Sequence, residues 1–328
     1  MPVSATKNKK SEILIKEMFY KAFPKEKIDD IIELTEGYFN VAYKVIAGKH
    51  SYILKIAPSA DTQVMTYEKN IMFSEVDSLN MIKRKTNVPV PKVLFYDNSH
   101  TICDTDYFFM ETLEGVSFSS VMDSMAQEDK EKVYFYTGKY TEMMNKITGN
   151  KFGYYGQKNR QGDNWYTVFR SMVVDVYHDA IRKDIFIPVT KERLLKILDE
   201  EKEIFEEVKT PKFVHWDVWA GNVFIHRGEV SGLIDFERCL WADELMEVGF
   251  RSYEYQKAFF EGYGIKDLSK NQKRRVLWYD VYLFLLCSLE CDYRLYDDMD
   301  TYDWSCRMLL EWVEEKLENH MYYKKCLL

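Results

Sequence analysis

Short runs in which apolar and polar residues alternate dominate the first third of the chain. This alternation predicts β-strands at residues 31–35, 41–46, 52–56, 88–96 and 107–111. Apolar residues at helical spacing predict helices at residues 12–22 and 67–84. Prolines in the fourth run support extended backbone there, because the residue before a proline disfavours helical geometry. The N-terminal part is therefore predicted to be a small α+β unit.

From residue 118 onward the apolar positions follow helical spacing. They predict helices at residues 118–125, 130–147, 164–181, 191–208, 241–263, 271–293 and 302–322. A strand-rich segment at residues 213–237 interrupts this series. Since strands give way to helices after residue 114, we predict one lobe of residues 1–114, with a flexible tail at 1–11, and a second lobe of residues 115–328.

Composition narrows the class of protein. The chain has 328 residues, 46% of them apolar and 30% charged, which is typical of a globular protein. Its net charge of −8 and the lack of a basic stripe disfavour nucleic-acid binding. The longest apolar run, residues 276–289, is too short to span a bilayer, and no apolar run of a signal peptide follows the basic residues 7–10. Six cysteines without metal-binding spacing indicate reduced thiols, so we expect a cytoplasmic protein without a membrane partner.

The segment FVHWDVWAGNVFIHRGEVSGLIDFE, residues 213–237, contains the residues most suited to chemistry. It predicts a strand, a polar loop with Asp217 and Asn222, a second strand, a turn, and a third strand that ends at Asp235. Alone, either aspartate would more often cap a turn. Together, the three side chains come to neighbouring strand ends. There Asp217 can orient or deprotonate a hydroxyl, while Asn222 and Asp235 hold Mg²⁺ against the phosphates of a nucleotide.

The pattern H-x-D-x-x-x-x-N, followed thirteen residues after Asn222 by I-D-F-E, resembles the catalytic core of the aminoglycoside phosphotransferase and choline kinase family, relatives of the protein kinases. The resemblance covers about residues 30–250. It implies an α+β, two-lobed protein-kinase-like fold, with a small antiparallel-sheet lobe and a mainly helical large lobe. It also implies transfer of the γ-phosphoryl group of ATP or GTP, with Mg²⁺, to a hydroxyl of a small molecule. Neither the choice of nucleotide nor the oligomeric state follows from it.

Lys55 lies inside the apolar run SYILKIA, where strand alternation also permits a solvent-facing lysine. The resemblance implies that this lysine contacts the α- and β-phosphates of the nucleotide and pairs with a helix glutamate. Glu75 is the predicted partner because of its interval before the VPVP segment. Glu68, seven residues earlier on about the same face of the predicted helix, is the alternative. A solvated helix glutamate is the competing interpretation for either.

Two further segments resemble nucleotide-binding parts of the family. LTEGYFNVAYKV matches the hairpin that covers the nucleotide, which implies a role for Gly37 and Asn40 in binding. The chain lacks the three-glycine loop of protein kinases. FMETLEG resembles the hinge between lobes, where backbone groups hydrogen-bond the base, so Glu111 and Leu113 are predicted to bind it.

Three residues around this core are expected to have structural roles. His215 is predicted to brace the loop that carries Asp217. Asp243 and Glu247 fall near positions that acids usually fill in the family, and they are expected to support the core. The chain departs from the family here, with Ala-Asp-Glu in place of the usual Gly-Asp-Pro.

The acceptor is the least determined part of the prediction. Acidic residues alternate with tyrosines after residue 291, and carboxylates and tyrosine faces attract ammonium groups. We therefore predict a cationic acceptor, most simply an aminoglycoside, bound by Glu237, Asp292, Asp297 and Asp298. A solvated acidic loop between two helices explains the same letters equally well.

Two other functions stay open. DVWAGN resembles the D-L-W-x-G-N form of fructosamine-type kinases, so the acceptor could instead be a fructosamine-like adduct, choline or a sugar. A protein of another class, a catalytically silent pseudokinase module, would bind nucleotide without transfer. The presence of the lysine, the asparagine and both aspartates argues against it, since a binding module has no need of a catalytic base.

Overall fold

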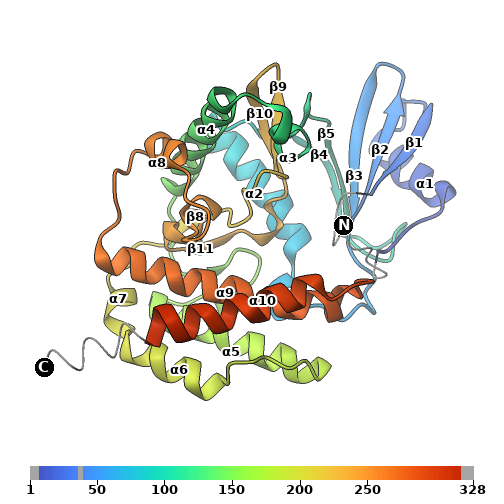
Figure 1. Cartoon of the computed structure of the whole chain (residues 1–328). Helices are drawn as coiled ribbons and strands as arrows, with labels where there is room; N and C mark the ends of the chain where they lie inside the picture. Colours follow the sequence, from blue (N-terminus) through green and yellow to red (C-terminus); the bar gives the residue numbers. More distant parts are fainter. Residues whose placement is uncertain (1–6, 36–39, 319–328) are drawn as a thin grey trace, which may run out of the picture.

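The N-terminal part of the computed structural model, which describes residues 7–35 and 40–318, contains a five-stranded antiparallel sheet (Figure 1). The strand order is β1-β2-β3-β5-β4. Its strands are β1 (Asp30–Leu34), β2 (Val41–Ala47), β3 (His50–Ile56), β4 (Val93–Asp97) and β5 (Tyr107–Glu111). The five predicted strands are confirmed, although β4 begins only at Val93, after both prolines.

Side-chain alternation gives this sheet two different faces. On one face Leu54 and Phe109 pack in a core cluster with helix α1 (Glu12–Ala22), whose N-terminus is capped by Ser11. The opposite face carries Lys55, which points toward helix α2 (Ile71–Lys85). The sheet thus presents one apolar face to α1 and a charged group to α2.

Helix α2 begins four residues later than predicted. Asn70 has a left-handed backbone, with φ of +59°, and therefore cannot continue a right-handed helix from the preceding residues. Thr66–Glu68 instead forms a separate 3₁₀ turn, η1. As a consequence, Glu68 and Glu75 do not lie on one helix face.

The C-terminal part is mainly helical, with the long helix α9 in its core cluster. Its helices in the described residues are α3 (Phe118–Val121), α4 (Gln127–Asn145), α5 (Trp165–Lys183), α6 (Lys191–Glu200), α7 (Lys202–Glu206), α8 (Lys257–Tyr263), α9 (Lys270–Arg294) and α10 (Asp300–Glu311). Figure 1 shows α9 and α10 crossing the molecule below the five-stranded sheet.

Two small antiparallel sheets carry the segment that the sequence singled out. The first contains β6 (Val116–Ser117), β9 (Val223–His226) and β10 (Glu229–Leu233); the second contains β7 (Gly153–Tyr154), β8 (Lys212–Val214) and β11 (Leu240–Ala242). The polar loop therefore connects β8 of one sheet to β9 of the other.

An apolar cluster joins α2 to these small sheets. Val76 and Leu79 of α2 share this cluster with Phe213, Val223 and Phe236. Figure 1 accordingly shows α2 in the middle of the molecule. The helix that carries Glu75 thus packs with both predicted lobes, and the division after residue 114 stays a prediction.

Three helix predictions in the C-terminal part need correction. Residues 241–263 are not one helix: they form the end of β11, two 3₁₀ turns (Glu244–Met246 and Val248–Phe250) and, only from Lys257, helix α8. The reason is that Asp243 and Glu247 are buried and accept hydrogen bonds from other segments, so the backbone between them follows those contacts. The predicted helix 191–208 is broken at Glu201 into α6 and α7.

The predicted helix 302–322 also differs from the structure. Helix α10 begins at Asp300, and a π-helix, η7 (Trp312–Glu318), follows it. Residues 319–322 of the prediction lie outside the described residues.

The described residues of the predicted tail contact the sheet. Asn8 Nδ2 donates to the Ala57 carbonyl at 3.0 Å, and Lys10 binds Asp104 at 2.5 Å. Residues 1–6 lie outside the described residues. In the part of the chain that the structure describes, no helix combines the length and the apolar character needed to cross a bilayer.

Candidate active site

The loop between β8 and β9 places Asp217 and Asn222 in direct contact. Asn222 Nδ2 donates to the Asp217 carbonyl at 2.9 Å and to its Oδ2 at 3.1 Å. This leaves the Asn222 Oδ1 oxygen available as a ligand for a cation. Burial raises the pKa of Asp217 to about 6, against the opposing charge of Arg238. A carboxylate with this pKa can accept a proton from a hydroxyl near neutral pH.

His215 braces this loop, as predicted. Its Nδ1 accepts from Asp217 N at 3.2 Å, and its Nε2 lies 3.1 Å from the Ile234 carbonyl, to which it donates when Nδ1 is the acceptor. Burial lowers the pKa of His215 to about 4, so the ring is neutral at pH 7. The ring therefore ties Asp217 to the strand that leads to Asp235.

Glu247 accepts hydrogen bonds from the backbone of the same loop. Its Oε1 accepts from His215 N at 3.0 Å and from Asn145 Nδ2 at 2.9 Å, and its Oε2 accepts from Trp216 N at 3.0 Å. Burial raises the pKa of Glu247 to about 7, while these donors favour the ionised form. The expected supporting role of Glu247 is confirmed, and Asp243 likewise supports the core by accepting from Arg275 at 2.6 Å.

The three hydrogen bonds that Glu247 accepts should stabilise the folded protein. In Glu247→Gln, the amide nitrogen must face a buried N–H donor, so at least one hydrogen bond is lost and a donor is left unsatisfied. We expect a loss of about 1–3 kcal/mol in unfolding free energy, measured by urea denaturation. The control is Glu244→Gln, which removes a partly exposed pair with Lys212 and should cost less than about 1 kcal/mol. Equal losses in the two variants would contradict this role for Glu247.

Lys55 lies between two carboxylates. Its Nζ is 2.6 Å from Glu75 Oε1 and 2.7 Å from Asp235 Oδ1, and its side chain is only 10% exposed. Lys55 is thus not a solvent-facing strand lysine. Glu68 instead binds Arg294 at 3.1 Å, so the structure decides between the two candidate partners in favour of Glu75.

The charges around Lys55 are unbalanced. Burial lowers the pKa of Lys55, but Asp235 and Glu75 outweigh it, so the net shift is upward. Burial raises the pKa of Glu75 to about 7 and that of Glu237 well above its usual value. Lys55 overcomes burial at Asp235 and holds the pKa of that carboxyl below its usual value. One ammonium therefore faces three carboxylates.

This oxygen-rich group fits a divalent cation. Carboxylate oxygens of Glu75, Asp235 and Glu237 lie within 4.8 Å of one another. Oε2 of Glu75 is buried and has no hydrogen-bond partner among the described residues. Mg²⁺ prefers such hard oxygen ligands and takes one or two from protein. Asp235 and the free oxygen of Asn222 are the predicted ligands; Asp235 belongs to this carboxylate group, and metal binding by the two residues stays a prediction.

Of the residues predicted to bind the nucleotide through the hairpin and the hinge, Asn40 contacts this carboxylate group. Asn40 Nδ2 donates to Glu237 Oε2 at 2.7 Å, and both side chains are buried. Gly37 lies outside the described residues. At the predicted hinge, Glu111 ends β5 and Leu113 packs against Gly232 of β10. Nucleotide binding by these residues stays a prediction.

The predicted acceptor residues are less closely grouped. Glu237 lies beside Asp235 in the site, whereas Asp292 lies near the end of α9, and Asp297 and Asp298 lie in the turn before α10. The acidic residue of α9 that acts on Asp217 is Glu290, whose charge adds to burial in raising the pKa of Asp217.

Sequence reasoning missed two residues whose charges affect the pKa of Asp217. Arg238 binds Glu290 at 2.9 Å, and its charge lowers the pKa of Asp217 against the effect of burial. Arg238 directly follows the I-D-F-E motif, and this position could have identified it as a residue of the site. Glu290 had no comparable signal, because 52 residues separate it from Arg238.

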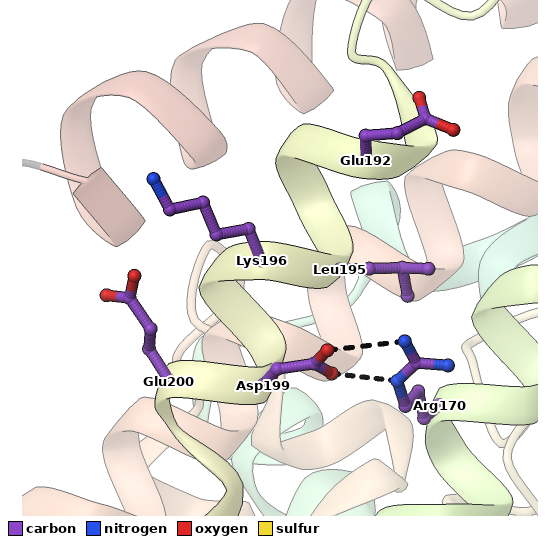
Figure 2. Close-up of a pocket in the computed structure, with 6 residues that line it drawn as sticks. All are labelled: Arg170, Glu192, Leu195, Lys196, Asp199 and Glu200. Atoms are coloured by element: carbon purple, nitrogen blue, oxygen red, sulfur yellow. Dashed lines mark hydrogen bonds and ion pairs between the residues drawn. The ribbon is translucent and has the colours of Figure 1, made fainter.

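A large hollow elsewhere on the surface is separate from these residues. It is a wide, open depression of about 580 Å³ between α5 and α6, and the Arg170–Asp199 ion pair belongs to its lining (Figure 2). Its lining includes no predicted site residue, so the candidate active site remains the group of residues around Asp217 and Lys55.

A small antiparallel sheet joined to a helical part, with paired lysine and glutamate on one side and an Asp–Asn loop on the other, defines a protein-kinase-like phosphotransferase. The sequence profile of the phosphotransferase enzyme family matches residues 30–275, and the chain belongs to this family. The predicted α+β, kinase-like fold is thereby confirmed, as is the predicted enzyme class.

Solved structures with the same fold include both kinds of kinase considered above. A protein described as a fructosamine-3-kinase, from Haemophilus somnus 129PT, has a TM-score of 0.68 and 16% identity, over 92% of this chain and 97% of its own. Aminoglycoside phosphotransferase APH(4)-Ia has a TM-score of 0.64 and 16% identity, over 93% and 99%. APH(2")-IIa, solved with streptomycin and ATP, has a TM-score of 0.61 and 13% identity, over 92% and 97%. No match was found among curated proteins.

Proposed function

We propose that the chain transfers the γ-phosphoryl group of ATP or GTP to a hydroxyl of a small, cationic molecule, with Mg²⁺ as cofactor. The observation that carries this proposal is the arrangement of Lys55 between Glu75 and Asp235, next to the Asp217–Asn222 pair. A binding module would need the first group alone. The complex of a similar fold with ATP supports a nucleoside triphosphate as donor.

Each residue has a defined task in this proposal. Lys55, held by Glu75, binds phosphate oxygens, and Asn222 and Asp235 hold the metal. Mg²⁺, when bound, neutralises charge on the phosphates. Asp217 accepts a hydrogen bond from the acceptor hydroxyl and orients it for in-line attack on the γ-phosphorus, then takes its proton.

A cationic acceptor is supported by the acidic turn after α9 and by the same fold in proteins solved with aminoglycosides. Structures of this fold have been solved with streptomycin, gentamicin and hygromycin B. An aminoglycoside acceptor would make the protein an antibiotic-resistance enzyme. The described cysteines are all free thiols, which suits the reducing cytoplasm.

A fructosamine-like acceptor is the second candidate. The observation that favours it is Trp219, two residues after Asp217, whose side chain is 38% exposed although indoles are usually well buried. An exposed ring beside the catalytic aspartate can stack on a sugar adduct. The likeness in fold to a protein described as a fructosamine-3-kinase supports the same candidate.

A single assay with a panel of acceptor compounds distinguishes these functions. Release of ADP or GDP is measured with ATP or GTP and Mg²⁺ against streptomycin, gentamicin, hygromycin B, choline and an N-fructosyl-lysine. We expect acceptor-dependent turnover with at least one cationic compound and none without Mg²⁺. Nucleotide binding without turnover on any acceptor would favour the pseudokinase module and contradict the proposal.

A further inference from the structure

The segment before α2, residues 65–70, is held by side chains of the C-terminal part. Asp179 of α5 accepts from Thr66 N at 2.6 Å through Oδ2 and from Thr66 Oγ1 at 2.7 Å through Oδ1. Gln157, in the loop between β7 and α5, donates from Nε2 to the carbonyls of Thr66 and Tyr67 at 2.9 and 3.2 Å. All four residues are buried. Both the amide and the carbonyl of Thr66 are therefore bound from outside the segment.

The end of the same segment is held in a similar way. Arg294 of α9 pairs with Glu68 Oε1 at 3.1 Å, and the other oxygen of Glu68 accepts from Met65 N at 2.8 Å. Asn70 Nδ2 donates to the Gly156 carbonyl at 3.1 Å. Because Asn70 directly precedes α2 and has a left-handed backbone, this hydrogen bond fixes the point at which the helix begins.

Helix α2 itself continues this attachment. Asp77 Oδ2 accepts from the Tyr155 hydroxyl at 2.5 Å, so the loop after β7 contacts the helix as well. Apolar packing does not assign α2 to either part, because its cluster includes residues of the sheet and of the C-terminal part. Toward the sheet, α2 makes the ion pair of Glu75 with Lys55. The polar contacts thus tie the start of α2 to the C-terminal part, and Lys55 reaches Glu75 from the sheet.

A displacement at Thr66 would be passed on to Glu75. Glu75 lies in the second turn of α2, and a helix of 15 residues moves as one body because its backbone is hydrogen-bonded throughout. The Lys55–Glu75 contact is 2.6 Å long, and the two side chains are 10% and 0% exposed. A shift of about 1 Å would therefore disturb this contact, since hydrogen bonds weaken steeply outside their normal geometry.

We propose that Asp179 is a positioning residue for the Lys55–Glu75 ion pair. By holding Thr66 it fixes the start of α2 on α5, and in this way it places Glu75 where Lys55 can pair with it. This role rests on the proposed function, in which Lys55 binds phosphate oxygens of the nucleotide. It gives a buried carboxylate of α5 an indirect part in nucleotide binding.

The variant Asp179→Asn tests this role against a matched control, Asp280→Asn. Asp280 of α9 is also buried, and it likewise accepts from the amide and the hydroxyl of one residue, Ser252, at 3.1 and 2.6 Å. In both variants the new amide group cannot accept from every donor, so both should lower the melting temperature.

Nucleotide binding should distinguish the two variants. Only Asp179→Asn should raise the Kd for ATP or GTP with Mg²⁺, measured by calorimetry, by about 3- to 30-fold. The Kd of Asp280→Asn should stay within about twofold of the wild-type value. An unchanged Kd in Asp179→Asn, or an equal rise in both variants, would overturn the proposal.

A double-mutant cycle tests the route through Glu75. If Asp179 acts by placing Glu75, adding Asp179→Asn to Glu75→Gln should raise the Kd by less than about twofold further. An undiminished further rise would show that Asp179 acts by another route and would overturn the proposal.

Hydrogen exchange of the nucleotide-free protein keeps the test independent of the proposed function. If the wild-type protein binds neither ATP nor GTP, the proposed function fails, and exchange at the amides of α2 then decides the present inference. These amides should lose more protection in Asp179→Asn than in Asp280→Asn, because only the first variant releases the start of the helix. Equal protection of α2 in the two variants would overturn the positioning role.

Discussion

Replacing Asp217 with alanine or asparagine is expected to remove phosphoryl transfer while leaving nucleotide binding almost unchanged. Asp217 contacts Asn222 but none of Lys55, Glu75 and Asp235, so the phosphate side of the site stays intact in either variant. Loss of a positioned general base costs about 10²- to 10⁴-fold in kcat. Turnover is measured by nucleotide-coupled assay and binding by calorimetry, which should give a Kd within about twofold of the wild-type value.

Asp267→Asn is a suitable control for this experiment. Asp267 is an exposed residue that pairs with Lys273 on the surface, outside the site. Its replacement should change neither turnover nor binding. Turnover at the wild-type rate in Asp217→Ala would refute the role of Asp217, and equal losses in both variants would show that the assay reports on stability.

Replacing Lys55 with methionine is expected to have the second large effect, on stability as well as on transfer. The change leaves Glu75, Asp235 and Glu237 close together without a cation. Removing one partner of a buried ion pair costs about 3–5 kcal/mol. We expect a loss of this size in unfolding free energy at pH 8, measured by urea denaturation, together with loss of transfer.

This loss should become smaller as the pH falls. In the wild type, burial raises the pKa of Glu75 to about 7 and Lys55 opposes that rise, so without Lys55 the folded-state pKa lies higher still. A carboxyl whose pKa is higher in the folded than in the unfolded state binds its proton more tightly when folded, so folding is favoured at low pH and penalised as pH rises. The stability of Lys55→Met should therefore fall from pH 6 to pH 8 more steeply than that of the wild type.

Two comparisons make the Lys55 result specific. Lys44→Met replaces a lysine of the neighbouring strand β2 that has no ion pair among the described residues, and it should cost less than about 1 kcal/mol. Mg²⁺ should stabilise Lys55→Met against unfolding, because a divalent cation can take the place of the lost ammonium. Equal stability of the two methionine variants would contradict the buried position of Lys55.

The sequence was sufficient for the fold class and for the residues of the catalytic segment. Asp217 and Asn222 are five residues apart, within one loop between two short strands, so local spacing alone places them together. The strands of the N-terminal sheet were likewise predictable, because each alternates apolar and polar residues over a few positions. The predictions of single helices at residues 191–208 and 241–263 were wrong, because buried ion pairs and hydrogen bonds with other segments interrupt them.

Local sequence spacing could not decide whether Glu68 or Glu75 pairs with Lys55. Both glutamates fitted one predicted helix, but the left-handed backbone of Asn70 separates them, and Arg294, 226 residues away, pairs with Glu68. Glu75 is therefore the glutamate that pairs with Lys55. Helical periodicity does not contain this information, since it describes only the nearest neighbours along the chain.

By itself, then, the sequence determined the reaction class and the residues that lie close together in the chain: the polar loop with Asp217 and Asn222, and the strand end at Asp235. Only the tertiary structure decided which charged and polar groups meet across the molecule, namely Lys55 with Glu75, Asn40 with Glu237, and Arg238 with Glu290. The physical reason is that a buried charge is stable only beside a compensating group. Which group compensates it depends on how distant segments pack, and no local pattern encodes that choice.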